Sequence, residues 1–137
     1  MNQLDKYKKI KLFGNLTTKF GGKTKDTNFH PGIDIAAPSG TPVPAFDDGV
    51  VTSVGSKNDG SGNIVTLKDK EGNSHQYSHL QGALTKVGQR VKKGQPIASL
   101  GKSGNSYSPS GGDPSHLDVR IVDINGKYKN PTNYLKK

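Results

Sequence analysis

The feature that most constrains the fold is a series of glycine-rich turns that divides residues 47–80 into short runs. The turns D-D-G, N-D-G-S-G-N and D-K-E-G-N are typical of hairpins, because glycine, asparagine and aspartate accept the backbone conformations that tight turns require. Between them lie the β-branched or alternating runs G-V-V-T-S-V-G, G-N-I-V-T-L-K-D and S-H-Q-Y-S-H-L. This pattern predicts a meander of three antiparallel strands.

The rest of the chain has the same character. The run Q-R-V-K-K-G-Q-P-I-A-S-L-G predicts two short strands around a turn at Lys93–Gly94, and H-L-D-V-R-I-V-D predicts another strand before a turn in I-N-G-K. No stretch has sustained helical periodicity, although Leu80–Thr85 could hold one turn of helix. We therefore expect an all-β single domain of antiparallel sheets forming an open groove at residues 13–137, after a basic, loosely ordered segment at residues 1–12.

The charge of the chain indicates a class of partner. Its formal net charge is +9, carried almost entirely by lysine, since the only arginines are Arg90 and Arg120. This excess favours a polyanion such as nucleic acid, anionic lipid or an anionic wall polymer, and surface lysines that only maintain solubility are the alternative. No basic run is interleaved with aromatic residues, so we expect no nucleic acid. The chain has no cysteine, which excludes disulfides and thiolate metal sites.

The start of the chain, M-N-Q-L-D-K-Y-K-K-I-K-L-F, has no apolar stretch after its lysines, so no signal peptide is visible. No segment approaches the roughly 20 apolar residues of a membrane span. We expect either a mature fragment or a protein that reaches its target without ordinary secretion, as phage lysins and phage-tail enzymes do.

Three separated runs contain the residues that could carry chemistry. His30 and Asp34 lie in N-F-H-P-G-I-D-I-A, His79 lies in Y-S-H-L, and His116 and Asp118 lie in S-H-L-D-V-R. A histidine and a carboxylate three residues apart can reach one metal ion, with the intervening proline and glycine fixing and loosening the backbone. Residues 116 and 118 alternate along a predicted strand and therefore share a face.

Each of these residues also has a structural interpretation. His79 could be a half-buried strand histidine, His116 a polar residue at the end of a loop, and Asp118 a carboxylate paired with Arg120 or a lysine. His75, which shares the face of His79 in a regular strand, is interpreted as a surface residue.

The order of these runs carries a resemblance to a known family. H-P-G-I-D-I-A-A-P-S-G-T-P-V is followed by D-G-V-V, Y-S-H-L, V-K-K-G-Q-P-I-A-S-L-G-K-S-G-N-S and S-H-L-D. Over roughly residues 16–124 this series resembles the lysostaphin-type (LytM-like) zinc endopeptidases that cut peptidoglycan. The resemblance implies that His30 and Asp34 bind zinc and that His79 and His116 are catalytic. The family's closing motif is H-x-H, and its second histidine is the third zinc ligand; this chain has Asp118 there.

The replacement by Asp118 changes what the resemblance implies. Aspartate is a competent zinc ligand, but it is shorter than histidine and prefers harder cations. Two carboxylates and one imidazole also cancel the charge of the ion, so that the ion acidifies its water less. We therefore expect one zinc per chain, bound more weakly, and a slower or more alkaline enzyme. The alternative is a degenerate, non-catalytic member that acts as a wall-binding or structural domain.

The implied setting is the bacterial wall. The expected substrate is a stem or cross-bridge peptide of peptidoglycan, met outside the cell, at the wall or from a virion, with anionic wall polymers or a larger phage or cell-surface assembly as further partners. Ser103 to Asp113 and the loop around Phe20–Phe29 are expected to line the cleft, with Tyr107 as a substrate contact. The run G-Q-R-V-K-K-G-Q-P-I-A-S-L also resembles biotinyl and lipoyl carriers, but Lys70 in D-K-E-G-N lacks their setting.

Overall fold

A computed structural model describes residues 10–11, 15–18, 20–21, 31–57, 62–102 and 115–136. These residues form strands, joined by turns, and one 3-10 turn, η1 (Pro131–Tyr134), which confirms the all-β prediction. No helix in this part of the chain is long and apolar enough to cross a membrane. Of the expected N-terminal segment, the structure describes β1 (Ile10–Lys11), and the domain boundary at residue 13 stays a prediction.

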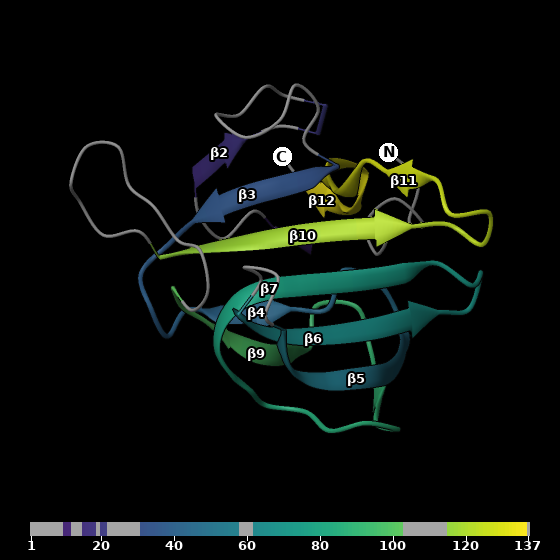
Figure 1. The fold of residues 1–137 in the computed structure, drawn as a ribbon, viewed down its shortest axis with the longest axis horizontal. Coiled ribbons are helices and arrows are strands. Elements are labelled where there is room, and N and C mark those ends of the chain that lie inside the picture. Colours follow the sequence, from purple (N-terminus) through teal and green to yellow (C-terminus); the bar gives the residue numbers. More distant parts are fainter. Residues whose placement is uncertain are drawn as a thin grey trace.

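A ten-stranded sheet dominates the described part. Its main path runs β2-β3-β10-β7-β6-β5-β8, and its pairings are antiparallel. Figure 1 shows β10 between β3 and β7. Its strands are β2 (Asn15–Thr18), β3 (Gly32–Ala36), β4 (Pro42–Pro44), β5 (Gly49–Lys57), β6 (Gly62–Asp69), β7 (Ser74–Ala83), β8 (Arg90–Val91), β9 (Pro96–Leu100), β10 (His116–Val122) and β11 (Tyr128–Lys129).

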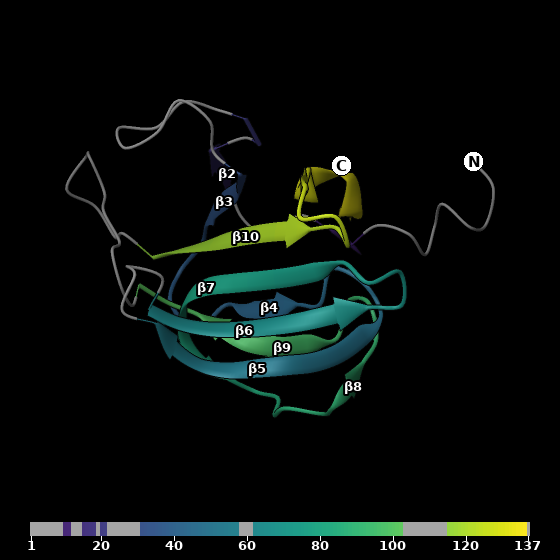
Figure 2. The ribbon, with the colours of Figure 1, turned by 45° about the vertical axis from the view of Figure 1, so that its right-hand side comes forward.

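The remaining pairings close the fold. β4 pairs with β9, β9 also pairs with β7, and β11 pairs with β10. Figure 2 shows β5, β6 and β7 curving around β4 and β9. β1 and β12 (Leu135–Lys136) form a separate parallel pair.

The predicted meander is confirmed as β5, β6 and β7, and β10 and its following turn are also where the sequence places them. β8 and β9 flank the turn at Lys93–Gly94, but they pair with β5 and with β4 and β7 rather than with each other. The suggested helical turn at Leu80–Thr85 is wrong. β7 continues to Ala83 because its last residues pair with β9. Hydrogen bonds to this distant strand therefore satisfy the backbone N–H and C=O groups that a helical turn would pair locally.

Alternation along β10 separates the core from the candidate site. Leu117, Val119 and Ile121 belong to the hydrophobic core, so His116 and Asp118 point to the opposite face of the sheet. This opposite face is where the predicted catalytic and metal-binding residues of the central strands have to meet.

Candidate active site

Two carboxylates face each other across neighbouring strands. Asp34 on β3 lies directly opposite Asp118 on β10, and Ser78 on β7 lies opposite Asp118 on its other side. Directly opposed residues of antiparallel strands place their side chains on one face, about 4.5–5.5 Å apart at Cβ. Like charges in this arrangement repel each other, so the face favours a positively charged group between or beside the two carboxylates.

Arg120 supplies one such charge. Its Nε donates to Oδ1 of Asp118 at 3.3 Å and its Nη2 donates to Oδ2 at 3.1 Å. The Asp118 side chain is 9% exposed and that of Arg120 is 38% exposed, so the pair lies at the boundary of the interior. Burial alone would lower the pKa of Arg120, but the charge of Asp118, the hydrogen bonds to Asp118 and the charge of Asp34 raise it above its ordinary value.

This pairing is the structural alternative that the sequence offered for Asp118. It does not exclude a metal ligand, because each carboxylate oxygen has two lone pairs and a forked arginine uses one of each.

His79, within β7, and His116, the first residue of β10, come together. Their ring centroids are 4.5 Å apart, with the planes inclined at 42°. His79 has a φ of 64°, a left-handed conformation found at no other non-glycine residue of the described chain. Such a conformation costs of order 1–3 kcal/mol and persists where surrounding structure enforces it.

For this reason His79 does not share the face of His75 and Tyr77, as it would in a regular strand. Tyr77 is fully buried in the core, where its hydroxyl accepts the Phe46 N–H at 2.9 Å. The left-handed backbone at His79 interrupts the alternation of β7 and turns its imidazole toward His116.

Gly101 holds the two histidine strands together. The N–H of His116 donates to the carbonyl of Gly101 at 3.0 Å, and a Cβ on Gly101 would lie 2.5 Å from the backbone nitrogen of Gln81. A side chain there would force β7 and β10 apart. The hydroxyls of Ser39 and Ser115, 2.6 Å apart, anchor the residue before His116 from a third segment.

Gly32 serves a similar purpose at the other end of β10. It pairs with Arg120, and a Cβ on it would lie 2.1 Å from the carbonyl oxygen of Val119 and 2.7 Å from Cγ of Arg120. The run H-P-G-I-D therefore needs glycine for close strand approach, whereas the sequence suggested a loosened backbone. The same register places Asp34 opposite Asp118.

Two predicted site residues lie outside the described residues, namely His30 and Tyr107. Most of the two loops expected to line the cleft also falls there. The structure thus brings Asp34 to Asp118 and His79 to His116, and β10 links the two pairs because His116 and Asp118 alternate along it. Gly101 is the contributor that sequence reasoning missed. The sequence offers Arg120 only as an alternative partner for Asp118, and Gly32 only as a point of backbone freedom.

A second group of acids is a structural cluster. Asp47, Asp69 and Glu71 bring ligand atoms within 4.8 Å of one another. However, the Asp69 carboxylate already accepts hydrogen bonds from the backbone nitrogens of Glu71 and Asn73, from Asn73 Nδ2 and from His75 Nε2, at 2.9–3.0 Å. A carboxylate with four donors has little capacity left for a cation.

His75 is therefore wrongly interpreted as a surface residue. It is fully buried, and burial lowers its pKa below the ordinary 6.5 despite the hydrogen bond to Asp69. For Asp69, burial on its own would raise the pKa, but the hydrogen bonds from His75 and Asn73 leave it below 3.8. The neutral histidine and charged carboxylate form a buried support beneath the turn between β6 and β7.

Comparison with known proteins decides the family. The model of peptidase family M23 matches residues 28–131. The chain belongs to peptidase family M23. The resemblance to lysostaphin-type enzymes is thereby confirmed.

Curated relatives of this M23 chain include proteins named as peptidoglycan endopeptidases. Peptidoglycan DD-endopeptidase ShyC of Vibrio cholerae is 41% identical over 102 residues, which are 74% of this chain and 22% of ShyC. The chain spans about a fifth of the length of the curated relatives it matches. Among solved structures, lysostaphin from Staphylococcus simulans has a TM-score of 0.75 and 28% identity, covering 90% of this chain and 50% of lysostaphin. A zinc-containing peptidase from Vibrio cholerae has a TM-score of 0.73 and 30% identity, covering 91% of this chain and 38% of its own.

Proposed function

We propose that this M23 domain hydrolyses peptide bonds of bacterial peptidoglycan with a zinc ion held by His30, Asp34 and Asp118. The observation that carries the proposal is the joint placement of two facing carboxylates and two contacting imidazoles along β10. Membership of family M23 and the activity named for ShyC support the substrate class. The zinc-containing peptidase from Vibrio cholerae supports the choice of metal.

The donor set suits zinc. Carboxylate oxygens and imidazole nitrogens are both ordinary zinc ligands, and the repulsion between Asp34 and Asp118 is relieved by a cation. His30 would complete the set, two residues before β3 begins. When bound, zinc supplies a Lewis acid that polarises the scissile carbonyl and promotes ionisation of water.

His79 and His116 would transfer the proton and stabilise the oxyanion. A neutral imidazole nitrogen of one accepts the proton of the attacking water and later returns it to the leaving amine. The N–H of the other donates a hydrogen bond to the oxyanion that develops on the scissile carbonyl.

The wider setting follows from the proposed substrate. The domain would act outside the cell or in the envelope, where peptidoglycan lies, and its lysines would favour approach to anionic wall polymers. Tyr107 would contact the substrate. Delivery by a phage lysin or tail, or by a larger surface assembly, stays a prediction, and a degenerate wall-binding domain is the second candidate function because of Asp118.

Zinc analysis and digestion of purified peptidoglycan test the proposal together. The native chain should contain about one zinc and release new amino groups from the wall. His30→Ala should lose the metal, whereas His79→Ala should keep it and hydrolyse about 10²–10⁴-fold more slowly. Lys127→Ala, an exposed change in the turn after β10, is the control and should resemble the native chain. Zinc-loaded protein that binds walls without cutting them would instead support the degenerate candidate.

A further inference from the structure

Two hydrogen bonds define the geometry of the Asp118–Arg120 pair. Both oxygens of the carboxylate receive a guanidinium hydrogen bond, one from Nε and one from Nη2. The stem of Arg120 lies across Gly32, where any side chain would meet Cγ of the arginine. A small residue opposite Arg120 is therefore required for the guanidinium to reach back along its own strand to Asp118.

The pair also has a particular net charge. Asp118 alone would add one negative charge beside Asp34, and Arg120 cancels it. Asp34 also interacts electrostatically with the guanidinium, so the positive charge of Arg120 acts on both carboxylates. Taken together, Asp118 and Arg120 present oxygen lone pairs with no net charge, as a neutral imidazole presents a nitrogen lone pair.

We propose that Arg120 is a positioning residue that fixes the Asp118 carboxylate and offsets its charge, so that the pair replaces a neutral histidine ligand. This inference rests on the proposed zinc function. It removes the charge-based reason to expect a slower or more alkaline enzyme, because zinc with Asp34, His30 and the pair has the same net charge of about +1 as zinc with one carboxylate and two imidazoles.

The proposal makes a non-additive prediction about substitution. Asp118→His alone installs an imidazole but leaves the charge of Arg120 uncompensated next to the metal. Asp118→His combined with Arg120→Gln restores the native charge. Arg120→Gln alone leaves the extra carboxylate charge, and Arg120→Lys keeps the charge but loses the forked hydrogen bonds.

Zinc affinity, measured by competition with a chelator, is the first readout. Adding Arg120→Gln to Asp118→His should strengthen zinc binding at least tenfold. Adding the same change to the native chain should strengthen zinc binding less or weaken it, because the Asp118 carboxylate also loses the hydrogen bonds that fix its orientation. Equal effects of Arg120→Gln in the two backgrounds would overturn the proposal.

The pH profile of hydrolysis is the second readout. The profile should move to higher pH in Arg120→Gln and to lower pH in Asp118→His, and it should return near the native position in the double variant and in Arg120→Lys. A purely structural arginine would lower turnover at every pH without moving the profile, which would also overturn the proposal. Urea unfolding of each variant shows which of them are folded, and Arg120→Lys keeps the test available if Arg120→Gln does not fold.

The two levels of proposal fail differently. A native chain that binds no zinc overturns the zinc function and this inference together. If the native chain binds zinc and cuts peptidoglycan, but substitution of Arg120 changes neither the zinc affinity nor the pH profile as expected, only the role of Arg120 is overturned.

Discussion

Two turns at one end of the sheet are built on the same aspartate motif. In the turn after β6 the Asp69 carboxylate accepts the backbone N–H groups two and four residues later, at 3.0 and 2.9 Å, and in the turn after β10 Asp123 does the same at 2.9 and 2.9 Å. Each has a left-handed glycine three residues after the aspartate, Gly72 at φ 89° and Gly126 at φ 83°. The backbone requirements of the two turns are therefore matched.

The two aspartates differ in what else they bind. Oδ2 of Asp69 also accepts Nδ2 of Asn73 and Nε2 of His75, both at 2.9 Å and both buried, whereas Asp123 is partly exposed. Asp69 thus extends a surface turn into the core, where His75 packs edge-on against Tyr134 with ring centroids 5.4 Å apart.

This difference predicts unequal costs for the same substitution. Asp123→Ala removes two hydrogen bonds to backbone amides near the surface and should cost about 0.5–2 kcal/mol, as loss of a helix N-cap does. Asp69→Ala removes the same two bonds and leaves two buried side-chain donors without acceptors, at about 1–3 kcal/mol each. Since these losses overlap, we expect about 3–5 kcal/mol in all, a large share of a stability of about 5–15 kcal/mol.

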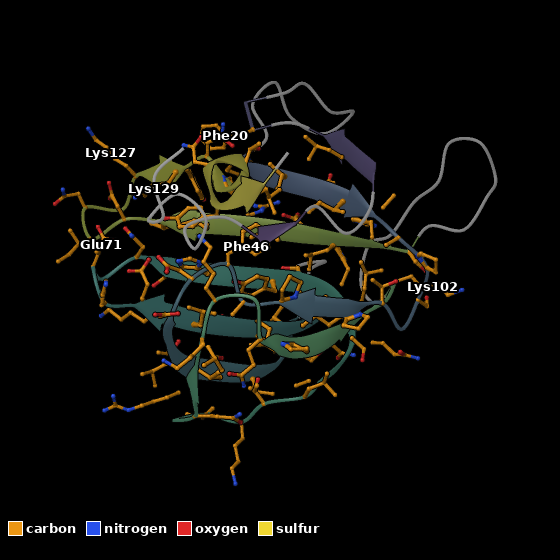
Figure 3. All side chains as sticks on the ribbon, turned by 180° about the vertical axis from the view of Figure 1, so that it is seen from behind. Phe20, Phe46, Glu71, Lys102, Lys127 and Lys129 are labelled. Atoms are coloured by element: carbon orange, nitrogen blue, oxygen red, sulfur yellow. The ribbon has the colours of Figure 1, made fainter. Side chains whose placement is uncertain are left out.

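Urea unfolding at pH 7.5 measures both variants. In Figure 3 Glu71 lies at the same end of the molecule as Lys127 and Lys129, and Lys102, next to the glycine that bonds His116, lies at the other end. Folded Asp69→Ala protein should therefore retain zinc and peptidoglycan hydrolysis at low temperature. Free energies of unfolding for the two variants within 0.5 kcal/mol of each other would show that the buried extension to His75 contributes nothing.

Three further predictions concern the same core and the candidate site. Because burial lowers the pKa of His75, the unfolded chain binds a proton at about pH 6 that the folded chain does not bind. The free energy of unfolding should therefore be complete above pH 6.5 and fall as the pH drops below it. Urea midpoints measured from pH 8 to 5 check this, and His75→Gln should flatten the dependence of stability on pH. Gly101→Ala places a Cβ 2.5 Å from the nitrogen of Gln81, so it should cost about 1–3 kcal/mol in thermal unfolding and lower turnover by separating the two imidazoles. Tyr77→Phe leaves the buried N–H of Phe46 without its acceptor and should cost about 1–3 kcal/mol with the zinc content unchanged, as metal analysis will show.

Local signals explain what the sequence could predict about the fold. The meander β5–β7 is marked by its own turns, and β10 by a β-branched run with a turn after it, so neither needs information from distant residues. β3 and β4 are short and follow proline and glycine, and their strand conformation is stabilised by partners far away in the chain. Propensity alone could not predict them.

The two buried histidines show where period-two reasoning succeeds and fails. Strict alternation puts His75 on the buried face of β7 with Tyr77, and a polar residue is tolerated there only because Asp69, across a hairpin, supplies an acceptor. It placed His79 on that same face incorrectly, because one left-handed residue breaks the alternation. Neither a hairpin partner nor a single unusual φ is visible in residue order.

The candidate site depends in the same way on strand register. Residue order predicts that His116, Asp118 and Arg120 share a face of β10, but it does not say which residues of β3 lie opposite. Gly32 sets that register, because only glycine fits against the carbonyl of Val119. A slip of one residue would turn Asp34 into the core and place an isoleucine opposite Asp118. The motif H-x-x-x-D therefore needs its glycine as much as its ligands, since the glycine decides whether the two carboxylates can reach the same cation.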